Sequence, residues 1–319
     1  MKKYTLLLLL FPFIISAQDF TMVDNVVRSA YKNVTSIENL AKRIDYDFKT
    51  DVEKTRAVFT WLTHNVRYKE HHSKLLKEPE FLVYFSEDHL KRIIKTKQEK
   101  KIKEAFEGRT AVCEGFSLLF KRICDLMNLE NELIYGYTKP SGDYVGILAT
   151  TKNHVWNAVK VNNKWIIIDP TYGAGQSYNG VWIREFNPTF FNTSISILNR
   201  THFPSETKWL NFQKQQKLEK FCSEPVVRNA FFKHKVDIVE PKEGVIDVKD
   251  NNLIKFKIRG VKNIKSLLYV FTNDGTVRTP KVRNKEGYND YYFQKPKEDT
   301  TLHIYINNEL ALEYAVKVE

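Results

Sequence analysis

The sequence predicts an α+β protein: N-terminal helices and a mixed central stretch, followed by a small all-β region. Residues 51–68 repeat apolar side chains every three or four positions, which is typical of a helix packed on a core. Residues 106–230 combine one apolar helix with short β runs. From about residue 237 the apolar period changes to two, which indicates strands. With 319 residues, the chain is long enough for two cores.

The composition excludes several classes of protein. Three Cys are too few to staple 319 residues, and 21 Phe, 16 Tyr and 5 Trp exclude a disordered chain. A single long apolar run and a negative mean hydropathy exclude a polytopic membrane protein. The net charge of +12 suggests an anionic partner, because composition bears on partners rather than on fold.

The first 17 residues read as a secretory signal peptide. Two lysines, Lys2 and Lys3, precede the apolar run Leu6–Ile15, and Ser16-Ala17 supplies small residues at its end. A membrane span needs about 20 residues, and this apolar run is shorter, which favours a cleaved signal. An uncleaved anchor is the alternative. We therefore expect an exported protein (periplasmic, cell-envelope or secreted) with no transmembrane span after signal removal. In that environment disulfides can form, yet three Cys leave at least one thiol unpaired.

Residues 18 to about 105 are expected to be helical and include a lysine-rich stretch. Its basic residues are Lys91, Arg92, Lys95, Lys97, Lys100, Lys101 and Lys103. Aromatic residues do not interleave with these charges and no nucleic-acid motif appears, so no nucleic acid partner is predicted. A solvated helix face is the simplest interpretation. An anionic envelope polymer bound through Lys91–Lys103 is the alternative.

The usual cofactor and metal motifs are missing from the sequence. Gly173-Ala174-Gly175 does not continue as a dinucleotide motif, and no phosphate-binding loop, His-Glu-x-x-His or paired Cys-x-x-Cys occurs. His71-His72 are adjacent and read as a surface pair. We therefore predict no cofactor and no metal site.

A nucleophile is predicted at the start of the apolar helix. Its buried face is marked by Phe116, Leu119, Phe120, Ile123 and Met127, so the helix begins near Ala111 or Cys113. A Cys in the first turn feels the positive end of the helix dipole, which favours the thiolate. Gly108 and Gly115 are expected to let backbone and substrate approach.

The other two cysteines carry no such signal. Cys124 lies about 16 Å further along the helix axis, on the apolar face, and is expected to be a buried, inert thiol. A straight helix keeps Cys124 from bridging to Cys113. Cys222 has no distinguishing context.

A base and its orienting acid are predicted on one hairpin. Residues 153–161 and 164–169 read as strands around the turn Asn162-Asn163, and Pro170 ends the second strand. A two- or four-residue loop puts His154 and Asp169 on the same face, about 7–8 Å apart at the backbone. A three-residue loop would separate them. A lone His or Cys is more often structural, but Cys113, His154 and Asp169 together suggest a catalytic triad.

The C-terminal residues 237–319 read as a small β-sandwich. Strands are expected at 253–258, 267–272, 301–307 and 310–318, with turns at Asn273-Asp274-Gly275 and Asn307-Asn308. This region contains no Cys and no catalytic constellation, so packing or presentation is its expected role.

Three segments resemble the transglutaminase-like superfamily, whose core is a papain-like cysteine-protease fold. They are Val112-Cys113-Glu114-Gly115-Phe116, His154-Val155-Trp156-Asn157-Ala158-Val159 and Asp169-Pro170-Thr171-Tyr172-Gly173-Ala174-Gly175, with Tyr172 where Trp is commoner. Further segments are similar to the kyphoscoliosis-peptidase branch: Trp61-Leu62, Arg67-Tyr68, Tyr135-Gly136-Tyr137, Thr201-His202-Phe203-Pro204 and Trp209-Leu210. The resemblance covers roughly residues 45–230.

The resemblance implies a role for each matched residue. Cys113 is the nucleophile, His154 the general base and acid, and Asp169 its partner, while Trp156 and Asn157 are supports. The backbone N–H of Cys113 would be one oxyanion donor, and the second donor is not assigned. The lysine-rich stretch 91–103 looks like an insertion relative to the family.

These expectations give a domain plan and a function. The plan is a signal peptide at 1–17, a transglutaminase-like cysteine-protease-fold domain at 18–230 and a β-sandwich-like domain at 237–319. The expected function is a peptidase or amidase that forms an acyl-enzyme on a protein or peptide substrate. Hydrolysis is favoured because the resemblance is closer to the peptidase branch and no calcium-site pattern is evident. The alternatives are amine transfer to protein glutamine and a non-enzymatic envelope binding module.

Overall fold

A computed structural model describes residues 19–70, 82–178, 181–214, 217–248, 253–260 and 264–318. The predicted signal peptide at 1–17 and the His71-His72 pair lie outside these residues. Within the described part of the chain, no helix is long and apolar enough to cross a membrane.

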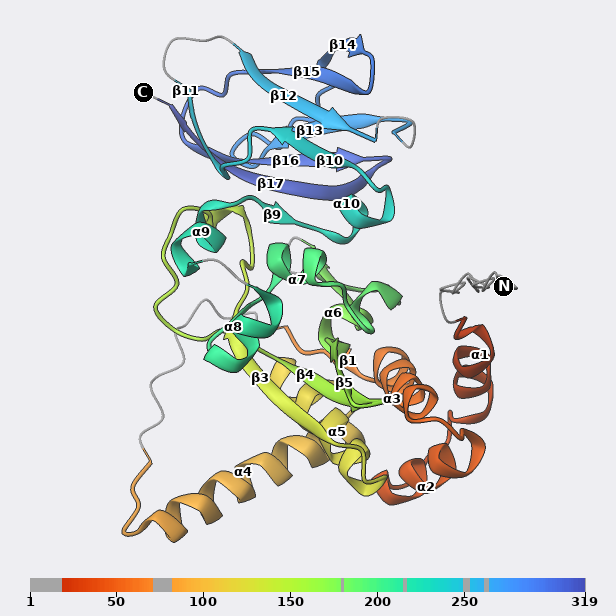
Figure 1. Ribbon diagram of the computed structural model, residues 1–319. Coiled ribbons are helices and arrows are strands. Elements are labelled where there is room, and N and C mark those ends of the chain that lie inside the picture. The colour runs from red at the N-terminus through yellow and green to blue at the C-terminus, as the bar shows by residue number, and fades with distance from the viewer. Residues whose placement is uncertain are drawn as a thin grey trace, which may run out of the picture.

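The N-terminal part is helical, as the sequence predicts, and its described residues form four helices (Figure 1). They are α1 (Thr21–Ala30), α2 (Ile37–Asp47), α3 (Asp51–Asn65) and α4 (Glu87–Glu107). Helix α3 is almost surrounded by protein, and Thr50 and Glu53 close a reciprocal capping box at its start. A buried ion pair joins α1 to α3, in which Nε and Nη2 of Arg56 donate to the Asp24 carboxylate at 2.8 and 2.7 Å.

The helix expected over 51–68 is shorter than predicted. It ends at Asn65, and β1 (Arg67–Tyr68) then pairs in parallel with β2 (Thr110–Ala111). The backbone N–H groups of Arg67 and Lys69 donate to carbonyls on the β2 side, which replaces the helical hydrogen bonds. This pairing places Tyr68 opposite Ala111, just before the cysteine helix.

A four-stranded antiparallel sheet lies at the centre, in the order β5-β4-β3-β8. Its strands are β3 (Asn131–Tyr137), β4 (His154–Val161), β5 (Lys164–Ile168) and β8 (Phe203–Pro204). Helix α5 (Cys113–Leu126) packs against β3 and β4 and is in turn contacted by α2, α3 and α4. The buried cluster that holds these elements together includes Trp61, Phe116, Leu119 and Phe120.

Short elements fill the rest of the central part. They are η1 (Gly142–Tyr144), α6 (Pro170–Ala174), β6 (Gly175–Tyr178), β7 (Val181–Arg184), η2 (Pro188–Phe190), α7 (Ile195–Thr201), α8 (Thr207–Gln213) and α9 (Leu218–Ser223).

The C-terminal region is a sandwich of two sheets, which confirms the predicted all-β character. One sheet has the order β10-β12-β15-β14 and the other β11-β17-β16-β13, with β9 also paired to β17. The elements are β9 (Val226–Val227), α10 (Asn229–Lys233), β10 (Asp237–Glu240), β11 (Val245–Val248), β12 (Leu253–Arg259), β13 (Leu267–Phe271), β14 (Lys281–Lys285), β15 (Tyr288–Gln294), β16 (Thr300–Ile306) and β17 (Glu309–Val318). Rings from opposite sheets meet between them: Phe256 with Tyr314, and Phe293 with Tyr269.

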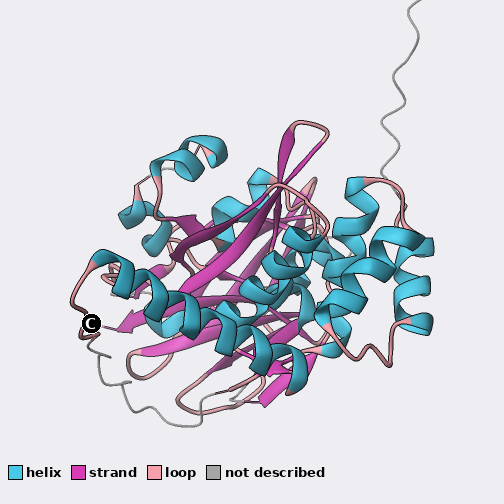
Figure 2. Cartoon of the chain, turned by 90° about the horizontal axis from the view of Figure 1, so that it is seen from below, coloured by secondary structure: helices cyan, strands magenta, loops and turns pink. Residues whose placement is uncertain are grey.

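The strand-rich region sits on one side of the central sheet, and α1–α3 lie on another (Figure 1). In the view from below, α1–α3 stay at the right and the long α4 crosses the near side (Figure 2). The polar residues of the predicted triad lie in the central part, between α5 and the β4–β5 hairpin.

Candidate active site

Cys113 is the first residue of α5, which is one of the two starts, Ala111 and Cys113, that the apolar period predicts. The preceding residue, Val112, provides no side-chain cap, so the first backbone N–H groups of the helix have no capping side chain. The Cys113 side chain is half-buried. Gly115 serves packing rather than substrate approach, because a Cβ there would lie 2.7 Å from the Ala111 Cβ.

The β4–β5 hairpin has the predicted register. Val161 pairs with Lys164, and both turn residues, Asn162 and Asn163, have positive φ angles of 48° and 61°. These angles are those of a tight two-residue hairpin turn. His154 and Asp169 therefore fall on one face, and His154 Nε2 lies 2.6 Å from Asp169 Oδ2.

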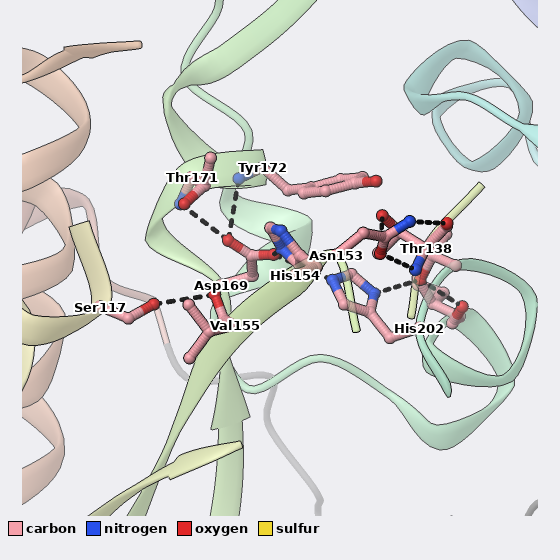
Figure 3. Close-up of polar contacts among 11 residues, drawn as sticks. Ser117, Thr138, Asn153, His154, Val155, Asp169, Thr171, Tyr172 and His202 are labelled. Atoms are coloured by element: carbon pink, nitrogen blue, oxygen red, sulfur yellow. Dashed lines mark hydrogen bonds and ion pairs between the residues drawn. The ribbon is translucent and has the colours of Figure 1, made fainter. Parts of the chain in front are cut away.

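Asp169 is a buried carboxylate with a full set of donors. Its Oδ1 accepts the backbone N–H groups of Thr171 at 2.7 Å and Tyr172 at 3.0 Å, because Asp169 caps helix α6. Its Oδ2 lies against Nε2 of both His154 and His202 (Figure 3). Burial alone would raise the pKa of Asp169, but the two imidazoles outweigh burial and hold that pKa well below its usual range.

His154 and Cys113 form an electrostatic pair. Burial lowers the pKa of His154, but the charge and hydrogen bond of Asp169 and the contact with Cys113 raise it well above its usual value. Burial raises the pKa of the Cys113 thiol, but the hydrogen bond and charge of His154 bring that pKa below its usual value. Because Nε2 faces Asp169, Nδ1 is the ring atom left for the Cys113 sulfur. The arrangement favours a thiolate beside an imidazolium.

His202 is a member of this network that the sequence did not assign to the site. It is fully buried, and its Nε2 lies 2.9 Å from Asp169 Oδ2. Burial lowers the pKa of His202. Its Nδ1 lies 2.7 Å from the Thr201 hydroxyl, which itself donates to the Ile197 carbonyl. The segment Thr201-His202-Phe203-Pro204 was matched to the family in the sequence. Its contact with Asp169 could not be predicted there, because the pairing of β8 with β3 is what brings His202 to Asp169.

The two predicted supports differ in what they do. The ring of Trp156 stacks beside that of His154, with centroids 5.9 Å apart. Gly136 makes room for it, because a Cβ there would lie 2.7 Å from the Trp156 ring. Asn157 donates to the Ser117 carbonyl at 3.1 Å, and Ser117 donates to the Val155 carbonyl at 2.9 Å. These two bonds fasten the helix of Cys113 to the strand of His154.

A cleft of about 240 Å³ opens beside His154. Its lining comes from the central part and from the start of the strand-rich region: Tyr68, Thr138, Pro140, Asn153, His154, Thr171, Tyr172, Gly175, Gln176, Ser177, Trp182, Val227, Arg228 and Asn229. Burial, followed by the nearby Cys113 charge, raises the pKa of Tyr68 to about 12, so this hydroxyl stays protonated. The cleft that His154 borders can therefore offer a hydroxyl donor.

Cys124 is placed as the sequence predicts, whereas the sequence makes no prediction for Cys222. Cys124 is fully buried, and burial raises the pKa of its thiol. Cys222 is also buried, and all three cysteines are unbridged.

His154, Asp169 and His202 are the one His/Cys/Asp/Glu group in the described chain whose ligand atoms gather closely enough for a metal. The separations of 2.6 and 2.9 Å are hydrogen-bond distances. Ligand atoms around a tetrahedral zinc lie about 3.3 Å apart, given bonds near 2.0–2.1 Å. The group as it stands is a closed hydrogen-bond network.

Comparison with known proteins agrees with this geometry. Residues 38–170 match the family model of the Transglutaminase-like superfamily. Kyphoscoliosis peptidase of Homo sapiens is 22% identical over 232 residues, which cover 72% of this chain and 32% of that protein. Hillarin of Drosophila melanogaster is 23% identical over 248 residues, which cover 73% of this chain and 28% of that protein. The chain thus spans about a third of the length of these curated relatives.

Among solved structures, one described as a TGase aligns with 57% of this chain and 40% of its own, at 13% identity and a TM-score of 0.28. The family match spans α5, β4 and β5 and includes Cys113, His154 and Asp169. Residues 38–170 of this chain therefore resemble the transglutaminase-like superfamily.

Proposed function

We propose that this chain is a thiol enzyme that transfers the acyl group of an amide or peptide bond through Cys113. The observation that carries the proposal is the buried His154–Asp169 pair, with Nε2 and Oδ2 2.6 Å apart, together with Cys113 at the start of α5, whose thiol pKa His154 lowers. A thiol paired with an imidazole that a carboxylate orients is the arrangement nucleophilic catalysis needs.

The steps follow from the protonation states of the pair. The Cys113 thiolate attacks the carbonyl carbon, and the carbonyl electron pair moves to oxygen. The His154 imidazolium then gives its proton to the leaving nitrogen, the C–N bond breaks, and a thioester remains on Cys113. Neutral His154 takes a proton from the acceptor, which attacks the thioester and releases the thiolate.

The transient oxyanion needs donors. The backbone N–H of Cys113, at the open start of α5, is the first. We propose the Tyr68 hydroxyl as the second. It is supported by the β1–β2 pairing that sets Tyr68 opposite Ala111, and by the cleft that Tyr68 borders.

Water as acceptor makes the enzyme a peptidase or amidase, which we propose as the main activity. Kyphoscoliosis peptidase carries that activity in its name, and the similarity to it favours hydrolysis. Export to the periplasm, cell envelope or medium is proposed from residues 1–17, and a protein or peptide is the proposed substrate.

The test is turnover of a denatured protein substrate, with and without a labelled primary amine. Cys113→Ala is expected to reduce release of new amino termini by about 10⁴-fold or more, whereas Cys222→Ala retains it. Cys113-dependent incorporation of the amine without new amino termini would replace hydrolysis by amine transfer. Equal turnover by the wild type and Cys113→Ala would refute the proposal of an enzyme that acts through Cys113. The non-enzymatic binding module would then be the remaining hypothesis.

A further inference from the structure

An apolar tip precedes helix α4 at its N-terminal end, and nothing in the described chain covers this tip. The tip comprises residues 82–85, that is Leu82, Val83, Tyr84 and Phe85, immediately before α4. All four are exposed, with Phe85 at 88% and Val83 at 74%. Single exposed apolar residues are ordinary, but four consecutive ones, two of them aromatic, mark an interaction surface.

Helix α4 and the tip together form an arm, and the N-terminal half of this arm does not pack on the core. Helix α4 buries Ile102, Ala105 and Phe106, all near its C-terminal end, where it packs on α5. Its N-terminal end lies at the edge of the molecule, far from the strand-rich region (Figure 1). The tip is therefore free to meet a large flat partner without a change in the rest of the fold.

Basic side chains follow directly behind the tip. Lys91, Arg92 and Lys95 lie about 6–12 Å along the helix from its start, at 1.5 Å per residue. All three are exposed, and no acidic group in the described chain pairs with Arg92 or Lys95. Lys91 lies 3.7 Å from Asp88, and both side chains of this pair are exposed. Glu87 and Asp88 are in the first turn of α4, near the positive end of the helix dipole.

We propose that the α4 tip and the basic residues behind it bind the surface of an anionic lipid bilayer. An apolar, aromatic tip gains free energy when it enters the boundary between headgroups and acyl chains, about 5–10 Å deep. At that depth Lys91, Arg92 and Lys95 reach the headgroups, where each basic residue attracts anionic lipid. The exposed tip favours a bilayer over a soluble polyanion, because a polyanion offers no apolar phase to Val83 and Phe85. This proposal does not depend on the activity of Cys113.

The test is flotation with vesicles, using the chain from Gln18, which holds every described helix and strand. Vesicles of phosphatidylcholine mixed with phosphatidylglycerol should carry the protein, and pure phosphatidylcholine should carry much less. Val83→Ser with Phe85→Ser should lower the partition coefficient at least tenfold. Arg92→Gln with Lys95→Gln should lower it about tenfold, and added salt should weaken binding further.

Matched controls exist at the opposite end of the molecule. Val277 and Val282 are exposed at 63% and 50%, and Lys281 and Arg283 lie on the fully exposed β14. Val277→Ser with Val282→Ser, and Lys281→Gln with Arg283→Gln, should leave flotation unchanged. The proposal is overturned if no vesicle carries the protein, or if the tip variant floats like the wild type. Retention on dextran sulfate without flotation would instead assign the arm to an anionic polymer.

Discussion

Two buried carboxylates, Asp169 and Glu313, are held ionised in different ways. Asp169 faces two imidazoles and two backbone N–H groups. Glu313, on β17, accepts the Gly142 N–H at 2.7 Å and the Arg228 Nε at 2.5 Å, and lies 3.5 Å from His303. Burial opposes ionisation of Glu313, but His303, Arg228 and Gly142 together lower its pKa to about 2.

The difference lies in the partners rather than in the carboxylates. Glu313 pairs with a guanidinium, that of Arg228, which also donates to the Pro140 carbonyl, so this cluster joins the loop before β4 to the strand-rich region. The partners of Asp169 titrate, and one of them, His154, reaches a partly exposed thiol. Glu313 therefore attaches one part of the fold to another, whereas the proposed role of Asp169 is to support proton transfer by His154.

Asp169→Asn should give the larger effect on activity. An amide cannot stabilise the imidazolium or keep His154 in the required tautomer, so turnover should fall about 10³–10⁴-fold. Steady-state rates with the same protein substrate measure this change. Retention of most of the activity would show that Asp169 serves the fold and not the chemistry.

Glu313→Gln should instead reduce stability. It leaves the Arg228 charge without its buried partner, which costs about 3–5 kcal/mol in the free energy of unfolding. Urea unfolding measures this loss, and alkylation of Cys113 should change little. A large loss of Cys113 reactivity at unchanged stability would show that Glu313 serves the site rather than the fold.

The stability of the Glu313 cluster also depends on pH. Its carboxyl pKa drops from 4.5 to about 2 on folding, so its contribution is complete above pH 4.5 and is lost as pH falls toward 2. The stability difference between wild type and Glu313→Gln should shrink over that window. A difference that stays constant down to pH 2 would show that the carboxylate charge is not what matters.

Tyr68→Phe should give a smaller effect that sharpens the site. Loss of one oxyanion donor is expected to lower the rate about 10–100-fold with an unchanged pH dependence of Cys113 alkylation. Tyr172→Phe, which changes another cleft tyrosine by one hydroxyl, is the matched control. Equal effects of both variants would argue against a special role for Tyr68.

The sequence predicts local structure and the hairpin register well. Asn162-Asn163 specifies a two-residue turn, and from that parity alone His154 and Asp169 share a face. The helix start at Cys113 follows from its apolar period. Both are properties of short stretches of chain.

What the sequence could not supply depends on distant pairing. His202 reaches Asp169 only through the β8–β3 contact, and Tyr68 reaches the cysteine helix through a strand of two residues. Strands β10, β11, β14 and β15 are not among the predicted strands. In β14 all residues, Lys281–Lys285, are exposed and show no apolar alternation. The Glu313–Arg228 pair spans 85 positions in the chain.

The most direct test of the central claim is the rate of Cys113 alkylation by iodoacetamide as a function of pH. We expect Cys113 in the folded chain to react with an apparent pKa below the ordinary thiol value of about 8.5, while buried Cys124 and Cys222 stay unlabelled. His154→Gln and His154→Ala should both slow the reaction at neutral pH. A Cys113 rate equal to that of thiols in the unfolded chain, and unchanged in both variants, would contradict the thiolate–imidazolium pair.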